Sequence, residues 1–505
     1  MDYLDPRKRH FHNIRLIVGY VLVAIVIGLG TVVLVYGANG YGINTKTGQI
    51  VQNALLFVDS NPGGAEITLN NKDQNATTSA RLVLPAGNYT LKLTKSGYRD
   101  WTRQFTLSEQ SVARYVYPFL FPVKPIVTDL KTYSAQPGLV TQTPDRRWLL
   151  VEAPDASATT PTFDEYDTTT LDQTSPVVTQ ASLPAGLLTD YSAASTLTAV
   201  EWSTDNANVL LEHTYSGGTE FVVFNRLHPD QSFNVNRMFN VTPSQVNLFN
   251  KKTSQLYIYR QDAQTLQLGN TGSKTLGSPL LKDVLAYKPY GSNLITYVTA
   301  SNEPAGTVAA RIWQSGTSYT LNEFPVGAKY LIDAAQFQGN FYYAAGSDTA
   351  NRINIYKNPL DQIQNPASSK ALPIISLDIS GAQKMGFSDN TRFIEAENGQ
   401  NFAVYDFETQ SYYEYTVADP LADNLSWMDG HRLLGETGSK VFVMDYDGTN
   451  SQLLGDSSET DGGLYNTAYT YLLDLAPASS GSGTVLQAVD MRAGTDLPKN
   501  KQPSA

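Results

Sequence analysis

Cysteine is absent from the 505-residue sequence, so the chain has no disulfide framework, no thiolate nucleophile and no thiolate metal site. Charge is also scarce, because Asp, Glu, Lys and Arg make up 16% of the residues, against roughly 25% in soluble proteins. Asn, Ser, Thr, Gly and Tyr take their place. These turn formers, combined with β-branched and aromatic residues, are what many short strands require. The composition therefore predicts a mostly β protein.

Positive charge is concentrated at the N-terminus. Residues 1–15 contain Arg7, Lys8, Arg9 and Arg15 against two aspartates, a net charge of +2, which leaves −13 on the rest of a chain whose total is −11. An acidic body repels phosphate backbones, and no basic stripe interrupts it. We therefore expect no nucleic-acid partner.

An uncharged hydrophobic run extends from Leu16 to Tyr36. As a helix at about 1.5 Å per residue it measures roughly 30 Å, the hydrocarbon thickness of a bilayer. We expect it to be a transmembrane helix in a lipid bilayer, with a cleaved signal peptide as the alternative. Four Lys or Arg precede the run and the first charge after it is Lys46, so the tail of residues 1–15 should be cytoplasmic and the body outside. Residues 37–53 should form a polar linker.

Short alternating stretches separated by turn clusters occupy residues 54–122. Ala65, Ile67 and Leu69 alternate with polar residues, and a similar stretch begins at Tyr89. Period-two alternation is typical of half-buried strands, and the glycines between them fit turns. The pattern predicts a compact antiparallel β-sandwich.

Three turn motifs in this segment resemble the PEGA domain. They are Asn61-Pro62-Gly63-Gly64-Ala65-Glu66-Ile67, Leu84-Pro85-Ala86-Gly87-Asn88-Tyr89 and Lys95-Ser96-Gly97-Tyr98. Gly63 or Gly64 stands where the family name implies Glu, and the turn chemistry is kept. The resemblance implies a surface-exposed bacterial β-sandwich that often sits between a membrane anchor and a larger module. It does not imply catalysis.

A degenerate sequence repeat, consisting of a turn, an apolar strand, a second turn and another strand, recurs over residues 126–493. Its copies are spaced by about 46 residues on average, and propeller blades repeat every 40 to 50 residues or so. We therefore predict a seven- or eight-bladed β-propeller, closed by a strand near Ile126–Tyr133 or Val485–Met491, and a disordered tail over residues 494–505. The first strands of the copies are anchored at Trp148, Val209, Leu256, Leu294, Phe341, Phe393, Leu433 and Tyr471.

Three segments resemble the strand and turn motifs of TolB-like and WD40-like propellers. They are residues 387–394, 402–409 and 441–450. That resemblance implies a fold and carries no function.

No catalytic, cofactor-binding or metal-binding residue can be nominated from the sequence. The segment Asp445–Asn450 has the carboxylates of a calcium loop, but the sixth and twelfth positions are Asn450 and Asp456 where an EF-hand needs Gly and Glu, so we expect a hairpin turn. No pair of histidines has metal-ligand spacing, and no G-x-S-x-G nucleophile elbow occurs. We expect surface or strand positions for the histidines of the body, which are His213, His228 and His431.

The sequence thus predicts a membrane-anchored, outward-facing cell-envelope protein. Its propeller would bind a protein or polysaccharide partner, with the PEGA-like module as a spacer. The alternatives are a surface hydrolase or lyase with its site in the central pocket of the propeller, and a structural component of a cell-wall or secretion assembly. Convergent carboxylates with a His at the channel mouth would favour the enzyme, and an apolar channel would count against it.

Overall fold

The computed structural model describes residues 6–38, 40–43, 50–155, 159–364, 371–418, 425–458, 463–479 and 483–502. The chain divides into two compact units. Unit 1 contains residues 1–124 together with 492–505, and unit 2 contains residues 125–491. The chain therefore leaves unit 1 once and returns to it at its C-terminal end.

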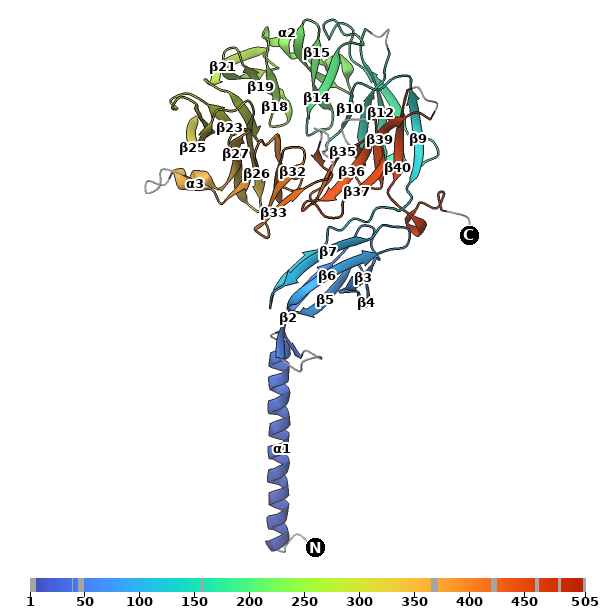
Figure 1. The fold of residues 1–505 in the computed structure, drawn as a ribbon, viewed down its shortest axis with the longest axis vertical. Coiled ribbons are helices and arrows are strands. Elements are labelled where there is room, and N and C mark those ends of the chain that lie inside the picture. Colours follow the sequence, from blue (N-terminus) through green and yellow to red (C-terminus); the bar gives the residue numbers. More distant parts are fainter. Residues whose placement is uncertain are drawn as a thin grey trace. The chain divides into compact units, whose positions relative to one another are not determined.

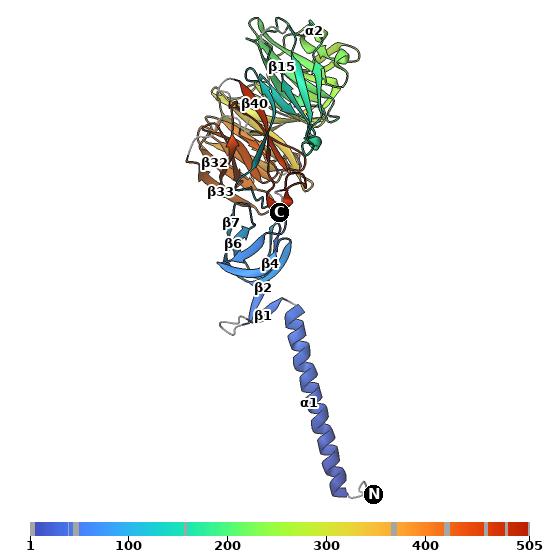
Figure 2. The same cartoon turned by 90° about the vertical axis from the view of Figure 1, so that its right-hand side faces the viewer.

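Unit 1 begins with one long helix, α1 (Pro6–Ala38), drawn in dark blue in Figures 1 and 2. It includes both predicted span ends, Leu16 and Tyr36, and starts well before the apolar run because the residues after Pro6 also favour helix. Its stretch Phe11–Gly37 is long and apolar enough to cross a membrane, and none of it is buried by protein. A helix that is apolar on all sides and exposed is suited to a lipid environment.

Two four-stranded sheets complete the N-terminal part of unit 1. One has the order β4-β3-β6-β7, and in the other β2 pairs with β1 and β5 and, in parallel, with β8. That parallel pair departs from the purely antiparallel prediction. The strands are β1 (Tyr41–Ile43), β2 (Ile50–Val58), β3 (Glu66–Leu69), β4 (Lys72–Thr77), β5 (Ala80–Pro85), β6 (Gly87–Thr94), β7 (Trp101–Leu107) and β8 (Val112–Tyr115).

The core of this sandwich contains the residues that the alternation selects. Ile67, Leu91 and Leu93 are fully buried, and Trp101 is buried beside them. The expected linker is shorter than predicted, because β1 and the start of β2 lie within residues 37–53 and pair with each other from Tyr41↔Gln52 onward. A short polar hairpin of this kind has too little hydrophobic pattern to be recognised in the sequence.

The C-terminal end also differs from the expected disordered tail. Residues 494–496 form a short 3₁₀ helix that packs on the Lys95–Tyr98 turn of the sandwich. The Asp496 carboxylate accepts hydrogen bonds from Tyr98 Oη at 2.8 Å and from Lys95 Nζ at 3.1 Å, and the Ala493 amide donates to Tyr98 Oη at 2.7 Å. Gly97 lies at φ +85°, where a side chain would lie against Ala493. Contacts between residues about 400 positions apart leave no local signal in the sequence.

Asp496→Ala is expected to free this C-terminal end and to destabilise unit 1 by about 1–2 kcal/mol, because it removes a partly buried acceptor of two charge-assisted or polar hydrogen bonds. Hydrogen exchange at the Ala493 amide should accelerate. Lys92→Ala is the matched control, since it removes an ion pair to Asp100 whose side chains are both exposed. Equal protection of Ala493 in wild type and Asp496→Ala would contradict the proposed role of this contact.

Unit 2 is a β-propeller whose described residues form eight four-stranded antiparallel sheets, which we call blades 1 to 8. In Figure 1 they follow one another around a ring, in teal, green, yellow, orange and red. Each of the eight predicted anchor residues lies on the second strand of a different blade. The repeat spacing is therefore confirmed, and the described strands make eight blades.

The strands of the first four blades are as follows. Blade 1 has β10 (Val140–Gln142), β11 (Trp148–Glu152), β12 (Thr162–Asp167) and β13 (Val178–Ser182), and blade 2 has β14 (Thr196–Trp202), β15 (Asn208–Tyr215), β16 (Gly218–Asn225) and β17 (Phe233–Asn234). Blade 3 has β18 (Gln245–Phe249), β19 (Lys252–Arg260), β20 (Thr265–Asn270) and β21 (Thr275–Leu281), and blade 4 has β22 (Ala286–Tyr290), β23 (Leu294–Thr299), β24 (Thr307–Gln314) and β25 (Thr317–Pro325).

The second half follows the same plan. Blade 5 has β26 (Tyr330–Phe337), β27 (Asn340–Ser347), β28 (Arg352–Lys357) and β29 (Ile375–Asp378), and blade 6 has β30 (Lys384–Phe387), β31 (Phe393–Glu397), β32 (Asn401–Asp406) and β33 (Ser411–Thr416). Blade 7 has β34 (Ser426–Trp427), β35 (Arg432–Thr437), β36 (Lys440–Asp445) and β37 (Gln452–Asp456). Short helices lie between strands: α2 (Val235–Phe239), α3 (Pro359–Ile363) and two 3₁₀ turns at Thr168–Thr170 and Pro229–Gln231.

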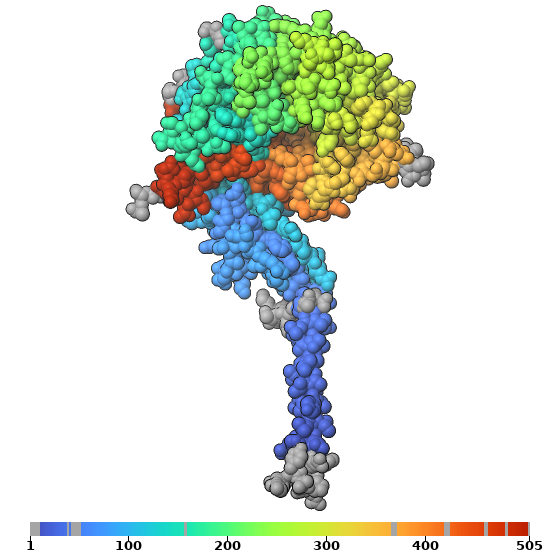
Figure 3. All heavy atoms as spheres, turned by 180° about the vertical axis from the view of Figure 1, so that it is seen from behind, coloured from blue at the N-terminus to red at the C-terminus, as the bar shows by residue number. Residues whose placement is uncertain are grey.

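Blade 8 closes the ring with strands from both ends of unit 2. It consists of β38 (Leu464–Tyr465), β39 (Tyr471–Pro477) and β40 (Thr484–Asp490), with β9 (Ile126–Tyr133) as its outermost strand. The β9–β40 register runs from Ile126↔Asp490 to Tyr133↔Thr484. In Figure 3 the red C-terminal surface of the propeller accordingly adjoins the teal surface of its first blades. Both strands proposed for closure from the sequence are used.

An ion pair recurs between the start of the second strand and the end of the third. In each case an Asp ends the third strand opposite the beginning of the second. In blade 6 the carboxylate of this Asp also accepts hydrogen bonds from backbone N–H groups of the turn that follows. This turn explains why the motif at residues 402–409 resembles a propeller repeat. The pairs are Arg147–Asp167 in blade 1, Arg392–Asp406 in blade 6 and Arg432–Asp445 in blade 7.

Candidate functional site

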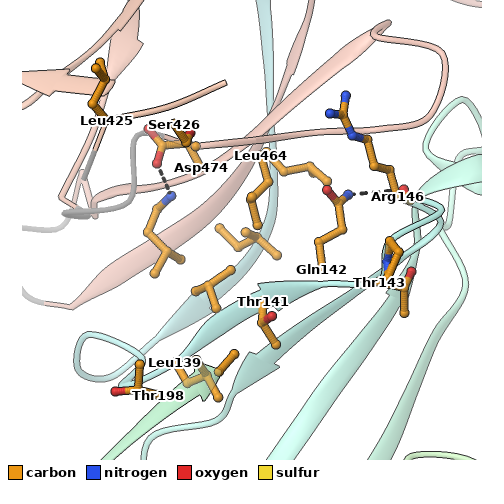
Figure 4. A pocket seen from close by; sticks show the side chains of 17 residues that line it. Leu139, Thr141, Gln142, Thr143, Arg146, Thr198, Leu425, Ser426, Leu464 and Asp474 are labelled. Carbon is orange, nitrogen blue, oxygen red and sulfur yellow. Dashed lines mark hydrogen bonds between the residues drawn. The ribbon is translucent and has the colours of Figure 1, made fainter. Parts of the chain in front are cut away.

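The propeller contains a cavity of about 520 Å³ that we call the axial cavity (Figure 4). Its wall includes the first strands of blades 1, 2, 7 and 8, which are β10, β14, β34 and β38, and it is completed by side chains of β39 and β40. The first strand of each blade lies nearest the axis of the ring (Figure 1). The cavity is thus assembled from two pairs of consecutive blades, which come from opposite ends of the propeller sequence.

Aliphatic side chains provide much of the wall. In Figure 4, Leu139 lies next to blade 1 and Leu464 approaches from the opposite side. Short polar side chains lie between them, and within the described residues no aromatic side chain lines the cavity. The aliphatic lining residues are Leu139, Val140, Ala199, Leu425, Leu464, Leu473, Leu475 and Leu486, and the uncharged polar ones are Thr141, Gln142, Thr143, Thr198 and Ser426.

Hydrogen bonds within the protein fix the polar residues of β10 and Thr143, which follows it. Thr141 Oγ1 accepts from the Trp202 indole at 2.9 Å, which ties blade 1 to blade 2. Gln142 Nε2 donates to the Arg146 carbonyl at 3.1 Å, and Thr143 Oγ1 accepts from the Trp148 amide at 3.0 Å. The turn between β10 and β11 therefore holds this wall of the cavity in one conformation.

Among the described lining residues Arg146 is the one cation, and its guanidinium is paired through Nη2 while Nη1 is buried without a hydrogen-bond partner. Its Nη2 donates to Asp389 Oδ2 of blade 6 at 2.8 Å, and its guanidinium lies 4.8 Å from the centre of the Tyr469 ring of blade 8. Burial raises the pKa of Asp389; the Arg146 charge opposes this shift and the charge of Asp429 adds to it. The pair joins the turns of blades 1 and 6 near the axis.

The one acidic residue of the lining, Asp474, is also bonded within the protein. Its Oδ1 accepts from the Leu475 amide at 2.9 Å and from Ser457 Oγ at 3.2 Å. Together with the Arg146–Asp389 pair, this leaves a cavity whose two charges are both held by internal partners.

His431 lies in the turn before β35, close to Asp429, but its surroundings do not suit acid–base chemistry. Burial is the main cause that lowers the pKa of His431 to about 4, although Asp429 opposes this. The imidazole packs on Phe393 at 5.3 Å between ring centres, and Asp429 forms its ion pair with Arg432 at 2.5 Å. In the part of the chain that the structure describes, no group of three or more His, Cys, Asp or Glu residues is arranged to hold a metal ion.

His213 occupies a strand position, in β15, and forms a buried network that the sequence did not reveal. It is fully buried, with Nδ1 3.0 Å from Glu220 Oε1. Burial opposes ionisation of Glu220, but the hydrogen bonds from His213, Thr189 and Asn234 lower its pKa to about 2. Thr189 belongs to the connection from β13 to β14, so this network fixes the segment that leads into the cavity strand β14.

The other residues singled out in the sequence lie apart from the cavity. Asp445–Asn450 forms the turn between β36 and β37, in which the Gly448 amide donates to the Asp445 carbonyl at 2.9 Å. His228 is exposed before a 3₁₀ turn. The span ends Leu16 and Tyr36 and the cation Arg15 lie on α1, as do the backbones of Arg7, Lys8 and Arg9.

Residues 54–118 match the PEGA domain. A comparison with curated proteins finds no match. Among solved structures, the chain is similar to the Dos1 propeller, with 12% identity and a TM-score of 0.44 over 72% of this chain and 95% of the other.

Two further solved structures are similar to a lesser degree. Oligogalacturonate lyase from Vibrio parahaemolyticus has 9% identity and a TM-score of 0.37 over 74% of this chain and 100% of its own. The RRP9 WD40 repeats have 9% identity and a TM-score of 0.37 over 72% of this chain and 97% of their own. At these identities the similarity concerns the β-propeller fold alone.

Proposed function

We propose that this chain is a membrane-anchored, outward-facing cell-envelope protein that binds a protein or polysaccharide partner through its β-propeller, with the PEGA domain as a spacer. The PEGA domain and the β-propeller fold support a surface or periplasmic protein. The exposed apolar stretch of α1, Phe11–Gly37, supports anchoring in the bilayer.

The observation that carries the binding role is the axial cavity. Its volume of about 520 Å³ falls in the range of pockets that hold ligands, about 300 to 1,000 Å³. The cavity has hydrogen-bonded, rigid walls, and both of its charged side chains are already bonded to protein groups. A preformed site of this kind supports binding, because little ordering of the protein is required when a partner enters.

The binding proposal is tested by capture from the native envelope. The full chain, tagged at its N-terminus and embedded in lipid nanodiscs, is incubated with envelope protein extract and, separately, with a glycan array. We expect saturable binding either of a protein from the extract or of a glycan on the array. An antibody that covers the propeller should abolish this binding. Absence of saturable binding in both, together with turnover of any arrayed glycan, would contradict the proposal in favour of an enzyme.

The anchor makes a separate prediction. Removal of residues 1–37 should move the protein from the membrane to the soluble fraction, because the apolar stretch of α1 is then lost. Protease added to intact cells should digest the region after residue 38 and leave an N-terminal tag protected, as the Arg7, Lys8, Arg9 and Arg15 charges require. A mature protein that begins near residue 38 would instead identify a cleaved signal peptide.

A further inference from the structure

We propose that the axial cavity binds an uncharged, aliphatic peptide segment of a partner protein, in extended conformation. This inference rests on the proposed function, and it narrows the two partner classes named there to one. It depends on three properties of the cavity wall: the lack of aromatic rings, the state of its charges and the free edges of its strands.

The wall is unsuited to sugar rings. Sugars expose a flat C–H face that packs best on the face of an aromatic side chain. The chain has 19 Phe, 30 Tyr and 5 Trp residues, yet the described lining residues include none of them. Leucine side chains such as Leu139, Leu464 and Leu475 instead form an irregular aliphatic surface that fits branched aliphatic side chains.

The charges of the wall are already bonded within the protein. Arg146 Nη2 is paired with Asp389, so the cation is neutralised locally, and Asp474 Oδ1 accepts from the Leu475 amide and from Ser457 Oγ. Arg146 Nη1 is buried without a hydrogen-bond partner among the described residues, so it can donate to an acceptor that enters the cavity. A peptide carbonyl supplies that acceptor without bringing a further charge into a partly apolar space, so the wall favours a neutral peptide.

Backbone groups give the wall its hydrogen-bonding capacity. β10, β14, β34 and β38 are the first strands of their blades, and each is paired with a neighbouring strand on one side only. Their inner edges present N–H and C=O groups toward the axis, as does any edge strand. An extended peptide offers complementary groups along its length, in the manner of β-strand addition. An acyl chain offers none, so the free edges favour a peptide over a lipid.

The size of the cavity limits the bound segment to a few residues, because an extended chain rises about 3.3 Å per residue. Thr198 on β14 and Ser426 on β34 are exposed lining residues on different blades. A large side chain at either position would occupy the cavity without disturbing a buried residue. These two positions therefore supply independent blocking variants, Thr198→Trp and Ser426→Trp.

The experiment is selection from a random heptapeptide phage library on the full chain in nanodiscs, followed by fluorescence anisotropy with the enriched peptides. We expect uncharged peptides rich in Leu, Ile and Val. Thr198→Trp and Ser426→Trp should each weaken binding about tenfold or more. Thr320→Trp, an exposed residue on the outer strand β25 of blade 4, should leave the affinity within about twofold of wild type.

Several outcomes would overturn the inference. No enrichment over empty nanodiscs, enrichment of charged peptides, or equal affinity for wild type and both blocking variants would each exclude peptide binding in the cavity. A dansyl-labelled fatty acid that binds wild type but neither blocking variant, with no peptide enriched, would identify an acyl ligand. If the blocking variants still capture an envelope protein or a glycan, the proposed function stands and this inference is wrong. If the wild-type protein captures neither, both the proposed function and this inference are wrong.

Discussion

Glu395→Gln is expected to raise the free energy of unfolding of the propeller by roughly 3–4 kcal/mol at pH 8. Glu395 lies in β31, 7% exposed, and its Oε2 has no hydrogen-bond partner among the described residues. Phe393 on the same face of β31 stacks on Trp427, so Glu395 and Glu397 point into the seam between blades 6 and 7. Burial first, and then the charge of Glu397, raises the pKa of Glu395 to about 8, while Lys384 opposes the shift.

The sign of the pH dependence follows from the raised pKa. The fold favours the protonated form of Glu395, so its stabilising contribution is complete below the ordinary pKa near 4.5 and is lost as the pH rises to about 8. Wild type should therefore lose roughly 4 kcal/mol of stability from this group between pH 5 and pH 9. Glu395→Gln cannot ionise and should lose none from this source. Urea unfolding of the full chain, followed by tryptophan fluorescence across this range, measures the difference.

Glu397→Gln is the matched control on the same strand and the same face. A Glu397 carboxylate oxygen accepts a hydrogen bond from the Gly399 amide, and Gln keeps an acceptor at that position. Because burial is the larger cause of the raised pKa of Glu395 and the Glu397 charge is the smaller one, we expect Glu397→Gln to stabilise the propeller at pH 8 much less than Glu395→Gln and to retain most of the pH dependence. Parallel stability curves for wild type and Glu395→Gln over pH 5 to 9 would show that Glu395 is not held protonated by the fold.

The seam that contains Glu395 differs from the other contacts between blades. Among the described residues its buried cluster consists of Phe402, Leu433 and Met444, beside the Phe393 ring that stacks on Trp427, whereas the cluster that joins blades 5 and 6 has thirteen buried residues. A smaller apolar contact combined with two buried carboxyls stabilises the ring less than the contact between blades 5 and 6 does. If the propeller opens locally, we expect the opening between blades 6 and 7.

The repeated strand pattern of the blades is the structural feature that the sequence indicated most clearly. The second strand of each blade is mostly buried and rich in apolar residues, as Leu294–Thr299 in blade 4 is, and such runs are visible without structural information. The blade number stayed between seven and eight because blade 8 combines β9 with three strands more than 300 residues later. Ring closure depends on a pairing that no local pattern specifies.

The cavity could not be predicted for a related reason. Three of its wall strands, β10, β34 and β38, contain only two or three residues, too few to show a period of two. Leu139 and Leu475 meet there although they are far apart in the chain. The contacts of the buried His213 and the partly buried Asp496 likewise depend on partners from other elements. Sequence patterns report which face of an element is buried, but not which elements meet.

Arg392→Met is expected to destabilise the propeller by roughly 3–5 kcal/mol, because it leaves a buried carboxylate without its cation. Arg392 Nε and Nη2 donate to the two oxygens of Asp406 at 2.9 and 2.6 Å. Asp406 is fully buried and also accepts from the Glu408 amide at 2.8 Å. Its remaining hydrogen bonds cannot compensate a buried negative charge. Chemical unfolding of the full chain at neutral pH measures the loss.

Blade 1 offers the same pair in an exposed setting and so supplies the control. Arg147 bonds Asp167 at 2.9 Å, but the Arg147 side chain is 51% exposed against 16% for Arg392. Water solvates the Asp167 carboxylate once the exposed Arg147 guanidinium is removed, so Arg147→Met should destabilise the propeller far less than Arg392→Met does. In the Arg392→Met variant, a second change of Asp406→Asn removes the charge and keeps an acceptor for the turn, so the double variant should regain most of the lost stability. A double variant as unstable as Arg392→Met alone would assign the effect to lost packing of the Arg392 stem instead of the uncompensated charge.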